Sequence, residues 1–430
     1  MKPRPVPPIT DDHGGSEAEG RSDDAFRRFP RARANLKKIM AAYSSGLTEG
    51  FRNGKFVVWI AALFPVELLH GFDLVIAVPE NHAAMLAARG MGAERAEAAE
   101  HLGFSMDLCS YARVDLGSHL ETDIGGLPSP DLIISDSNNC SLLVKWFDVY
   151  RRERNIPHFV VDVPFCYQPQ RDEDRAYITS QFKELIGLIE ELSGQVFDPD
   201  SVRRAIRHTN EANAHWHRFL SLARQRPAGI TAFDTFAHMA PFISAHRGTP
   251  VHADHFRIAA DEATQHITDG VFPVPEEKYR LLWDNIAPWH QLGAMSRRLT
   301  ELGAAVVYAP YTGCIGTVEG KVERFAANNS DPLDTLARSQ NFTVTSYGMG
   351  LRLEALVEAV QKYKIDGVIF SSNRSCKVYS VMQMDTARKL KEQTGVSTVS
   401  VDVDHADPRK YSEEGVFVRI EALLEEIGGK

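Results

Sequence analysis

The sequence of 430 residues contains no long apolar run and no excess of basic residues. Its most apolar stretch, Phe56–Phe64, stops before Pro65, whereas a membrane span needs about 20 apolar residues. The first residues lack the apolar core of a signal peptide. Because 48 Lys and Arg stand against 57 Asp and Glu, the net charge of −9 argues against a nucleic-acid binder. We therefore expect a cytoplasmic protein that binds neither membrane nor nucleic acid.

Cysteine is also scarce, and its number is odd. Five cysteines do not make a disulfide scaffold, and the lack of any CxxC pair excludes zinc fingers and the common ferredoxin spacing. A cluster held by cysteines far apart in the sequence remains open. The sequence also has no Gly-x-x-x-x-Gly-Lys-Ser/Thr loop, so ATP hydrolysis belongs to another protein. The thiols to consider are Cys109, Cys140, Cys166, Cys314 and Cys376.

The remaining composition is that of a globular α/β protein. Residues 1–24 are rich in Pro, Gly, Ser and charged residues and are expected to form a disordered tail. Residues 25–180 are predicted to form a first α/β domain with an N-terminal helix, and 181–278 a helical connecting region. Residues 279–430 are predicted to form a second α/β domain. The predicted fold class is α/β, with two Rossmann-like parallel-sheet domains, an N-terminal helical segment and a helical middle region.

Two segments of the sequence resemble each other. Each contains an Asp, a short strand, a loop rich in Ser and Asn, a cysteine, a helix and a second strand, which is one βαβ unit. The first runs from Asp131 through Cys140 and a helix over 141–152 to a strand over 159–162. The second runs from Asp366 through Cys376 and a helix over 377–392 to a strand over 399–402. The repeat predicts two similar domains.

The repeat also places a cysteine just past the carboxyl end of a strand in each domain. Open parallel sheets bind ligands at that edge. Cys140 and Cys376 are therefore candidate metal ligands, and the alternative for each is a small buried hydrophobe. Cys109 stands at the start of a helical segment, where the thiolate is favoured. Cys166 and Cys314 look more like spare thiols, and whether either contacts a metal stays open.

Glu67 is the best carboxylate candidate for catalysis. It follows the apolar stretch 56–64, which is predicted to be a strand, and so lies at a carboxyl edge of the sheet. A carboxylate near an apolar pocket has a raised pKa and exchanges protons near neutral pH. The alternative is an ordinary exposed glutamate at a helix N-terminus. Asn81, His82 and the histidines of the helical middle region receive no role.

Several short motifs occur in one order along the chain. They are Pro65-Val-Glu-Leu68, Asp107-Leu-Cys-Ser-Tyr111, Cys140 with Lys145-Trp-Phe147, Asn373-Arg-Ser-Cys-Lys-Val-Tyr-Ser380 and Asp402-Val-Asp-His-Ala-Asp-Pro-Arg409. Together they resemble the 2-hydroxyacyl-CoA dehydratase and benzoyl-CoA reductase family, of the 2-hydroxyglutaryl-CoA dehydratase D-component type. The resemblance covers about residues 51–426. Two departures, Asn373 where His is frequent and Val378 where Pro is frequent, remove no cysteine.

The resemblance implies an iron–sulfur catalytic subunit. Cys109, Cys140 and Cys376 would hold one [4Fe–4S] cluster and leave one iron open for substrate oxygen. The implied reaction is radical: a ketyl radical anion of a 2-hydroxyacyl-CoA loses its 2-hydroxyl group and then a β-proton to give the enoyl-CoA. Glu67 would face the substrate. Arg374 and Lys377 flank Cys376 and are candidates to offset negative charge.

The resemblance further implies partners. These are an acyl-CoA substrate, a homologous second subunit or a second copy of the chain, and a separate ATP-hydrolysing iron–sulfur activator. Two alternatives remain: a subunit of the benzoyl-CoA reductase type that reduces an aromatic acyl-CoA, and a non-catalytic partner that relays electrons. The sequence indicates neither the acyl group nor the residues that bind CoA.

Overall fold

The computed structural model describes residues 27–121, 126–167, 170–313, 331–340 and 348–429. The predicted disordered tail, 1–24, lies outside these described residues, and so does Cys314. Within the described ranges, none of the helices is long and apolar enough to cross a membrane.

The chain forms two four-stranded sheets in which all strands are parallel. The strand orders are β2-β1-β3-β4 and β6-β5-β7-β8, so the two sheets have the same topology. This confirms the predicted fold class. The strands of the first sheet are β1 (Val57–Ile60), β2 (Val75–Ala77), β3 (Leu132–Asp136) and β4 (His158–Val161). Those of the second are β5 (Tyr279–Asp284), β6 (Ala304–Tyr308), β7 (Gly367–Asn373) and β8 (Ser397–Val403).

Helices surround both sheets. In the first α/β unit they are α1 (Pro30–Arg52), α2 (Val66–Leu69), α3 (Pro79–Ala88), α4 (Gly92–His101), α5 (Ser110–Leu116), the π-helix Gly117–Glu121 and α6 (Ser141–Arg154). The middle region contains α7 (Asp172–Ser193), α8 (Pro199–Ser221), α9 (Ala232–His238), α10 (Pro250–Thr268) and a 3₁₀ turn, Leu222–Arg224. The second unit contains α11 (Leu292–Glu301), α12 (Pro310–Gly313), α14 (Met349–Tyr363), α15 (Lys377–Ser380), α16 (Gln383–Thr394), α17 (Glu413–Gly428) and 3₁₀ turns at Trp289–Gln291 and Pro408–Lys410. Helix α13 (Pro332–Ser339) follows β6 in the chain but packs against α7, α8 and α2.

The repeated aspartate of the sequence has the same role in both units. The carboxylate of Asp131 accepts a hydrogen bond from the N–H of Val57, at the start of β1, with an N···O distance of 2.8 Å. The carboxylate of Asp366 accepts one from the N–H of Arg280, near the start of β5, also at 2.8 Å. Each aspartate thus ties the start of the third strand to the first strand of its sheet. The two βαβ units are confirmed as equivalent.

The predicted strand over 56–64 is shorter in the structure. Strand β1 ends at Ile60, and Ala61 makes the last backbone bond toward the neighbouring strand, to Ile134 O. The next amide, of Ala62, donates instead to the carboxylate of Glu80. Because a side chain outside the sheet takes this N–H, the chain turns away here and continues into α2.

The helix predicted over 377–392 is also divided, into α15 and α16. Met382 leaves helical geometry, with ψ near 2°, and the Ser380 hydroxyl donates to the carbonyl of Asn373, at the end of β7. This bond keeps α15 against the strand end, so the main crossover helix starts only at Gln383. Helix α7 runs without a break through residue 180, where we placed the end of the first domain, and the division into domains stays a prediction.

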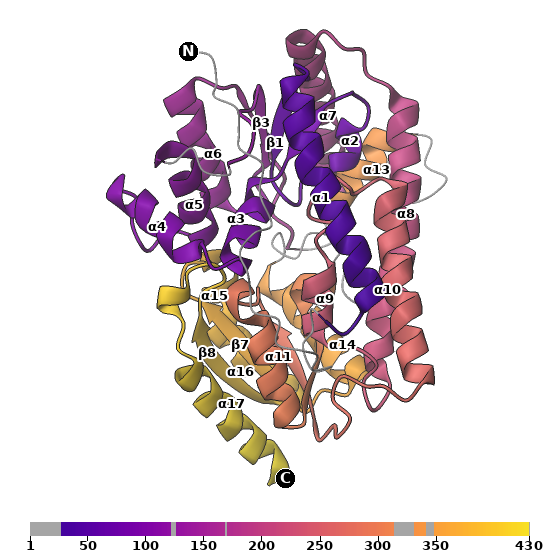
Figure 1. Ribbon diagram of the computed structural model, residues 1–430, viewed down its shortest axis with the longest axis vertical. Coiled ribbons are helices and arrows are strands. Elements are labelled where there is room, and N and C mark those ends of the chain that lie inside the picture. The colour runs from indigo at the N-terminus through magenta and orange to yellow at the C-terminus, as the bar shows by residue number, and fades with distance from the viewer. Residues whose placement is uncertain (1–26, 122–125, 168–169, 314–330, 341–347, 430) are drawn as a thin grey trace.

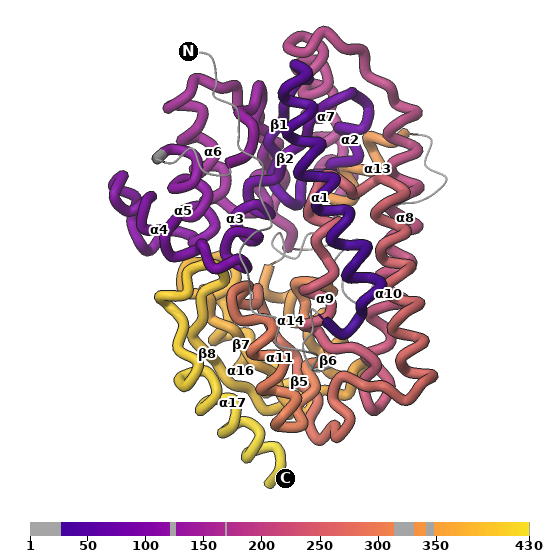
Figure 2. Tube along the Cα trace, in the orientation of Figure 1, coloured from indigo at the N-terminus to yellow at the C-terminus, as the bar shows by residue number. Residues whose placement is uncertain are grey.

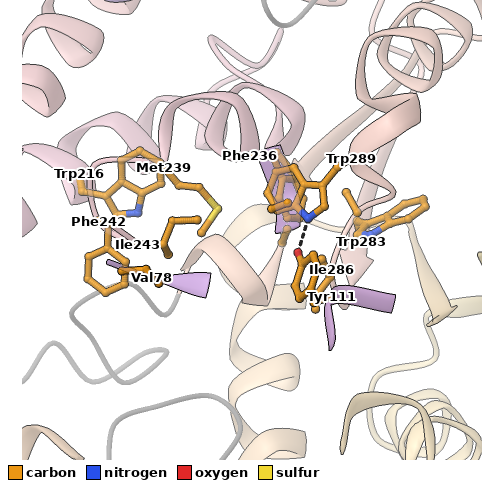
Figure 3. Close-up of a cluster of buried hydrophobic side chains, with 14 of the residues drawn as sticks. Val78, Tyr111, Trp216, Phe236, Met239, Phe242, Ile243, Trp283, Ile286 and Trp289 are labelled. Carbon is orange, nitrogen blue, oxygen red and sulfur yellow. Dashed lines mark hydrogen bonds between the residues drawn. The ribbon is translucent and has the colours of Figure 1, made fainter. Parts of the chain in front are cut away.

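The two units lie one above the other in Figure 1, and α8 and α10 run along one side past both. Helix α1 packs against α10. Figure 2 shows α17 at the outer end of the second unit, away from the first. The buried side chains form one continuous core through both units. At the junction between the units, Trp289 donates its indole N–H to the hydroxyl of Tyr111, as Figure 3 shows.

Candidate functional site

Three of the cysteines occupy the same local position. Cys109, Cys140 and Cys376 are the N-cap residues of α5, α6 and α15. Strand β3 ends four residues before Cys140, at Asp136, and β7 ends three residues before Cys376, at Asn373. Cys140 and Cys376 therefore stand at the carboxyl edges of the two sheets, and all three thiols stand at the start of helices. All three side chains are partly exposed.

The three thiols are within electrostatic reach of one another. Burial raises the pKa of the Cys109 thiol well above its usual value, and the charges of Cys376 and Cys140 raise it further. Burial raises the pKa of Cys376 to about 12, again with a contribution from Cys140. The first-turn amides of the three helices act in the opposite sense and favour each thiolate. Thiols separated widely in the sequence are thus close enough to influence one another's charge.

A cation that was not predicted acts on Cys376. Arg374 pairs with Asp402 at the surface, with an N···O distance of 3.3 Å, and Lys377 donates to the carbonyl of Arg374. The buried guanidinium of Arg352, on α14, instead lies 4.8 Å from the ring centre of Tyr379. Its charge lowers the pKa of Cys376 against the larger effect of burial. Arg352 is therefore the charged group that favours a thiolate at Cys376.

Glu80 is a carboxylate within electrostatic range of Cys140, as Asp404 is of Cys376. It is the second residue of α3, directly after β2, and is partly buried. Its Oε2 atom accepts the N–H of Ala62 at 2.6 Å. Burial raises the pKa of Glu80 to about 7, with a further contribution from the charge of Asp136. The charge of Glu80 in turn raises the pKa of Cys140. Like Glu67, Glu80 is a carboxylate that follows the end of a strand, so the sequence offers the same reason to expect it near the carboxyl edge of the sheet.

A second buried carboxylate lies next to Glu80. Asp136 is the last residue of β3 and is fully buried. Within the described part of the chain, neither of its carboxylate oxygens has a hydrogen-bond partner. Burial raises the pKa of Asp136 to about 7, and only the charge of Arg247 and its own backbone amide act against this. Such an acid is protonated in part at neutral pH and so can donate or accept a proton.

Glu67 lies on α2 and is almost completely buried, with 1% of its surface exposed. Its Oε1 atom is 3.1 Å from Nε of Arg247 and accepts a hydrogen bond from the hydroxyl of Thr209 at 2.7 Å. Glu67 is thus neither an exposed glutamate nor in contact with a cysteine in the described structure. Its partner Arg247 connects it to Asp136 electrostatically. The catalytic role of Glu67 stays a prediction.

One group of side chains has the spacing of a metal site: His82, Asp115 and His119, all buried. The Asp115 carboxylate accepts hydrogen bonds from the indole of Trp146 at 2.8 Å and from the hydroxyl of Tyr150 at 2.6 Å. Both ring nitrogens of His119 are also engaged, one with the carbonyl of Asp115 and the other with the N–H of Leu127. This group is therefore a structural hydrogen-bond network that supports α5.

Comparisons with known proteins show the family of the chain. The family described as 2-hydroxyglutaryl-CoA dehydratase, D-component, matches residues 62–427. The chain is 33% identical over 407 residues to the (R)-phenyllactyl-CoA dehydratase alpha subunit of Clostridium sporogenes, covering 93% of this chain and 96% of that one. It is 30% identical to the (R)-2-hydroxyisocaproyl-CoA dehydratase alpha subunit of Clostridioides difficile, covering 92% and 95%. It is 28% identical to a benzoyl-CoA reductase subunit of Thauera aromatica, covering 85% and 87%.

Matches of this length leave no large part of the chain unaccounted for, and they include every motif that carried the resemblance. The chain is a subunit of an enzyme, and it belongs to the 2-hydroxyglutaryl-CoA dehydratase D-component family.

Proposed function

We propose that the chain is the [4Fe–4S]-bearing subunit of a 2-hydroxyacyl-CoA dehydratase, which removes water from a 2-hydroxyacyl-CoA to give the enoyl-CoA by radical elimination. The observation that supports the proposal is that Cys109, Cys140 and Cys376 are each the N-cap residue of a helix and lie within electrostatic range of one another. Relatives named as alpha subunits of (R)-phenyllactyl-CoA and (R)-2-hydroxyisocaproyl-CoA dehydratases support the substrate class.

The chemistry of the three thiols fits an iron–sulfur cluster. Buried thiols that raise one another's pKa are poor thiolates alone, and a bound cation removes that penalty. Soft thiolate ligands select iron–sulfur clusters over hard cations. Three protein ligands would leave one iron open. When bound, the cluster would supply one-electron chemistry and a Lewis-acidic iron.

The protein's own groups would move the protons. The elimination removes the 2-hydroxyl group and one β-hydrogen as water, and because the electron that enters at the start leaves at the end, it needs no net oxidant. A carboxyl group with a pKa of about 7 can take up the β-proton and return a proton to the departing hydroxyl. We assign this role first to Glu80, which is partly exposed near Cys140. Glu67 is the second candidate, through Arg247.

A reductase activity toward an aromatic acyl-CoA, of the benzoyl-CoA reductase type, is the second candidate function, and the relative from Thauera aromatica favours it. Such an enzyme would consume two electrons for each product, whereas a dehydratase recycles its electron. Measuring the electrons consumed per acyl-CoA converted therefore separates the two. A non-catalytic subunit that relays electrons would convert neither substrate.

We further propose the setting in which the enzyme works. The relatives are themselves named as subunits, so the chain is expected to pair with a homologous second subunit or a second copy. The sequence has no Walker loop, so a separate ATP-hydrolysing iron–sulfur activator is expected to deliver electrons. The enzyme would work in the cytoplasm and in the absence of oxygen, because oxygen oxidises donors of low-potential electrons.

Anaerobic reconstitution followed by iron and sulfide analysis tests the proposal. Cys109→Ala, Cys140→Ala and Cys376→Ala should each lose most of the iron that the wild-type chain binds, because each removes one of three ligands. Cys166→Ala is the matched control: it removes a buried cysteine outside the proposed ligand set and should keep its iron. Unchanged iron in any of the first three variants would remove that cysteine from the site.

A further inference from the structure

The two cysteines that come from different α/β units each have a serine as neighbour, and these serines touch. Ser110 follows Cys109, and Ser375 precedes Cys376. The N–H of Ser110 donates to the hydroxyl oxygen of Ser375 at 3.2 Å, and the two hydroxyl oxygens are 3.3 Å apart. Both serines are buried. The chain segments that carry the two thiols are therefore joined directly by hydrogen bonds.

Two residues of the turn after β8 complete this contact. The Ser375 hydroxyl donates to Oδ2 of Asp404 at 2.6 Å. The Ser110 hydroxyl is 3.0 Å from Nε2 of His405, whose Nδ1 is 3.2 Å from Oδ1 of Asn373. Asp404, His405 and Asn373 are all fully buried. One consistent assignment of hydrogens satisfies every group: Ser375 donates to the carboxylate, Ser110 donates to His405, and His405 donates to Asn373.

The same turn is attached to α5 at a second point. Oδ1 of Asp404 accepts the N–H groups of Ala406 at 3.1 Å and Asp407 at 3.0 Å, which fixes the shape of the turn. Oδ2 of Asp407 then accepts a hydrogen bond from Nη1 of Arg113 at 2.8 Å. The segment after β8 thus contacts α5 at two residues, Ser110 and Arg113, which are about one helical turn apart.

We propose that Ser110, Ser375, Asp404 and His405, here called the serine latch, are positioning residues that set the separation of the Cys109 and Cys376 thiols. This inference rests on the proposed function, since only a shared cluster would need that separation. A cluster core is rigid, and its ligands must be positioned to within about half an ångström. Each serine is next to its cysteine in the chain. The contact between the two serines therefore fixes the position of the Cys109 segment relative to the Cys376 segment of the other unit.

Thiol cross-linking in the full-length, cluster-free chain tests the latch. Bifunctional methanethiosulfonates of short and longer span would be applied without oxygen, and the Cys109–Cys376 product would be quantified by peptide mass spectrometry. Ser375→Ala should lower the short-span yield about tenfold, because the junction loses several buried hydrogen bonds, while the longer reagent restores the yield. A general loss of folding would lower both yields together. The control is Thr300→Val, whose hydroxyl bonds to Ser296 O within α11, a helix that carries no cysteine; its yields should match wild type.

Iron binding separates the latch from the proposed function. If the wild-type chain is cross-linked efficiently by the short reagent but binds no iron, the proposed function is wrong, and the positioning role of the serine latch is not contradicted. Ser375→Ala that keeps both the short-span yield and the iron of wild type would overturn the latch. If Ser375→Ala does not fold, Asp404→Asn replaces it, since it keeps side-chain size and weakens the bond to Ser375. An unchanged short-span yield in Asp404→Asn would equally overturn the latch.

Discussion

The guanidinium of Arg113 and the carboxylate of Asp407 form an ion pair that joins the two α/β units, with an N···O distance of 2.8 Å and no exposed side-chain surface on either residue. Arg113 also donates to the carbonyl of Leu108, next to Cys109. Asp407 is held on its other side by Arg409, at 2.7 Å. The pair therefore connects the loop that carries one thiol to the turn that supports another.

Replacing Arg113 by Met should lower the free energy of unfolding by about 1.5–3 kcal/mol, because the buried Asp407 carboxylate loses one of its two arginine partners and keeps only Arg409. Urea unfolding measures this. The control is Arg388→Met on α16, an exposed arginine that pairs with Glu392 at 2.9 Å and should cost less than about 1 kcal/mol. If the two variants lose equal free energy of unfolding, the buried ion pair stabilises the protein no more than the exposed pair does.

Lowering the pH should reduce the free energy of unfolding, because it protonates the carboxylate of Asp407. The bonds from Arg409 and Arg113 outweigh the effect of burial and hold the pKa of Asp407 at about 2. A carboxyl whose pKa is lower in the folded state stabilises the protein above its unfolded pKa, and this contribution is lost as the pH falls toward the folded value. The advantage of wild type over Asp407→Asn, about 2 kcal/mol at neutral pH, should therefore narrow between about pH 5 and pH 3. Urea unfolding across this range checks it, and a constant difference would contradict it.

Local patterns in the sequence were sufficient for the two parallel sheets and for the equivalent positions of Cys140 and Cys376 after strand ends. Asp131 and Asp366 precede strands of the same type, and the structure gives them the same bond, so the repeat was visible as sequence. The helix over 377–392 was wrong because its interruption depends on the Ser380 bond to Asn373, which no local periodicity encodes.

The groups around the thiols could not be predicted in the same way. Arg352 acts on Cys376 from α14, and His405 contacts Cys109 across 296 residues of sequence, from the other α/β unit, so tertiary packing brings both groups there. Glu67 follows a strand as predicted, but its partners Arg247 and Thr209 lie 180 and 142 residues further along the chain. Contacts over such separations depend on tertiary structure, and a short motif does not contain them.

Glu67→Gln should lower turnover while leaving bound iron unchanged, because Glu67 is proposed to act on protons and not as a ligand. It should also lower the free energy of unfolding by about 3 kcal/mol, since Arg247 keeps its buried charge without a counter-charge. Thr209→Val is the control: it removes only the 2.7 Å hydrogen bond and should cost about 1–2 kcal/mol with turnover retained. If the Glu67→Gln variant folds and keeps full turnover, Glu67 has no catalytic role and serves only as the ion-pair partner of Arg247.

Glu80→Gln should change stability in a pH-dependent way. Since burial raises the pKa of Glu80 to about 7, the folded state keeps a proton that the unfolded state releases above about pH 4.5. The stability of wild type therefore falls as the pH rises from about 4.5 through 7. Gln stays neutral and still accepts the N–H of Ala62, so the variant should match wild type at about pH 5 and exceed it by up to about 3 kcal/mol at pH 8. Glu49→Gln, an exposed change on α1, should show no such difference.

The same Glu80→Gln variant tests catalysis independently of stability. If Glu80 transfers the proton, its loss should lower turnover by about 10²–10⁴, and iron content should be unchanged because Glu80 is not one of the proposed ligands. The pH profile of wild-type turnover should then contain a titration near pH 7 that the residual activity of the variant lacks. Because the variant is expected to be more stable than wild type at about pH 8, unfolding would not account for lost activity there. Full turnover at that pH would assign the proton transfer to another group, of which the fully buried Asp136, with its pKa also raised to about 7, is the nearest by electrostatic contact.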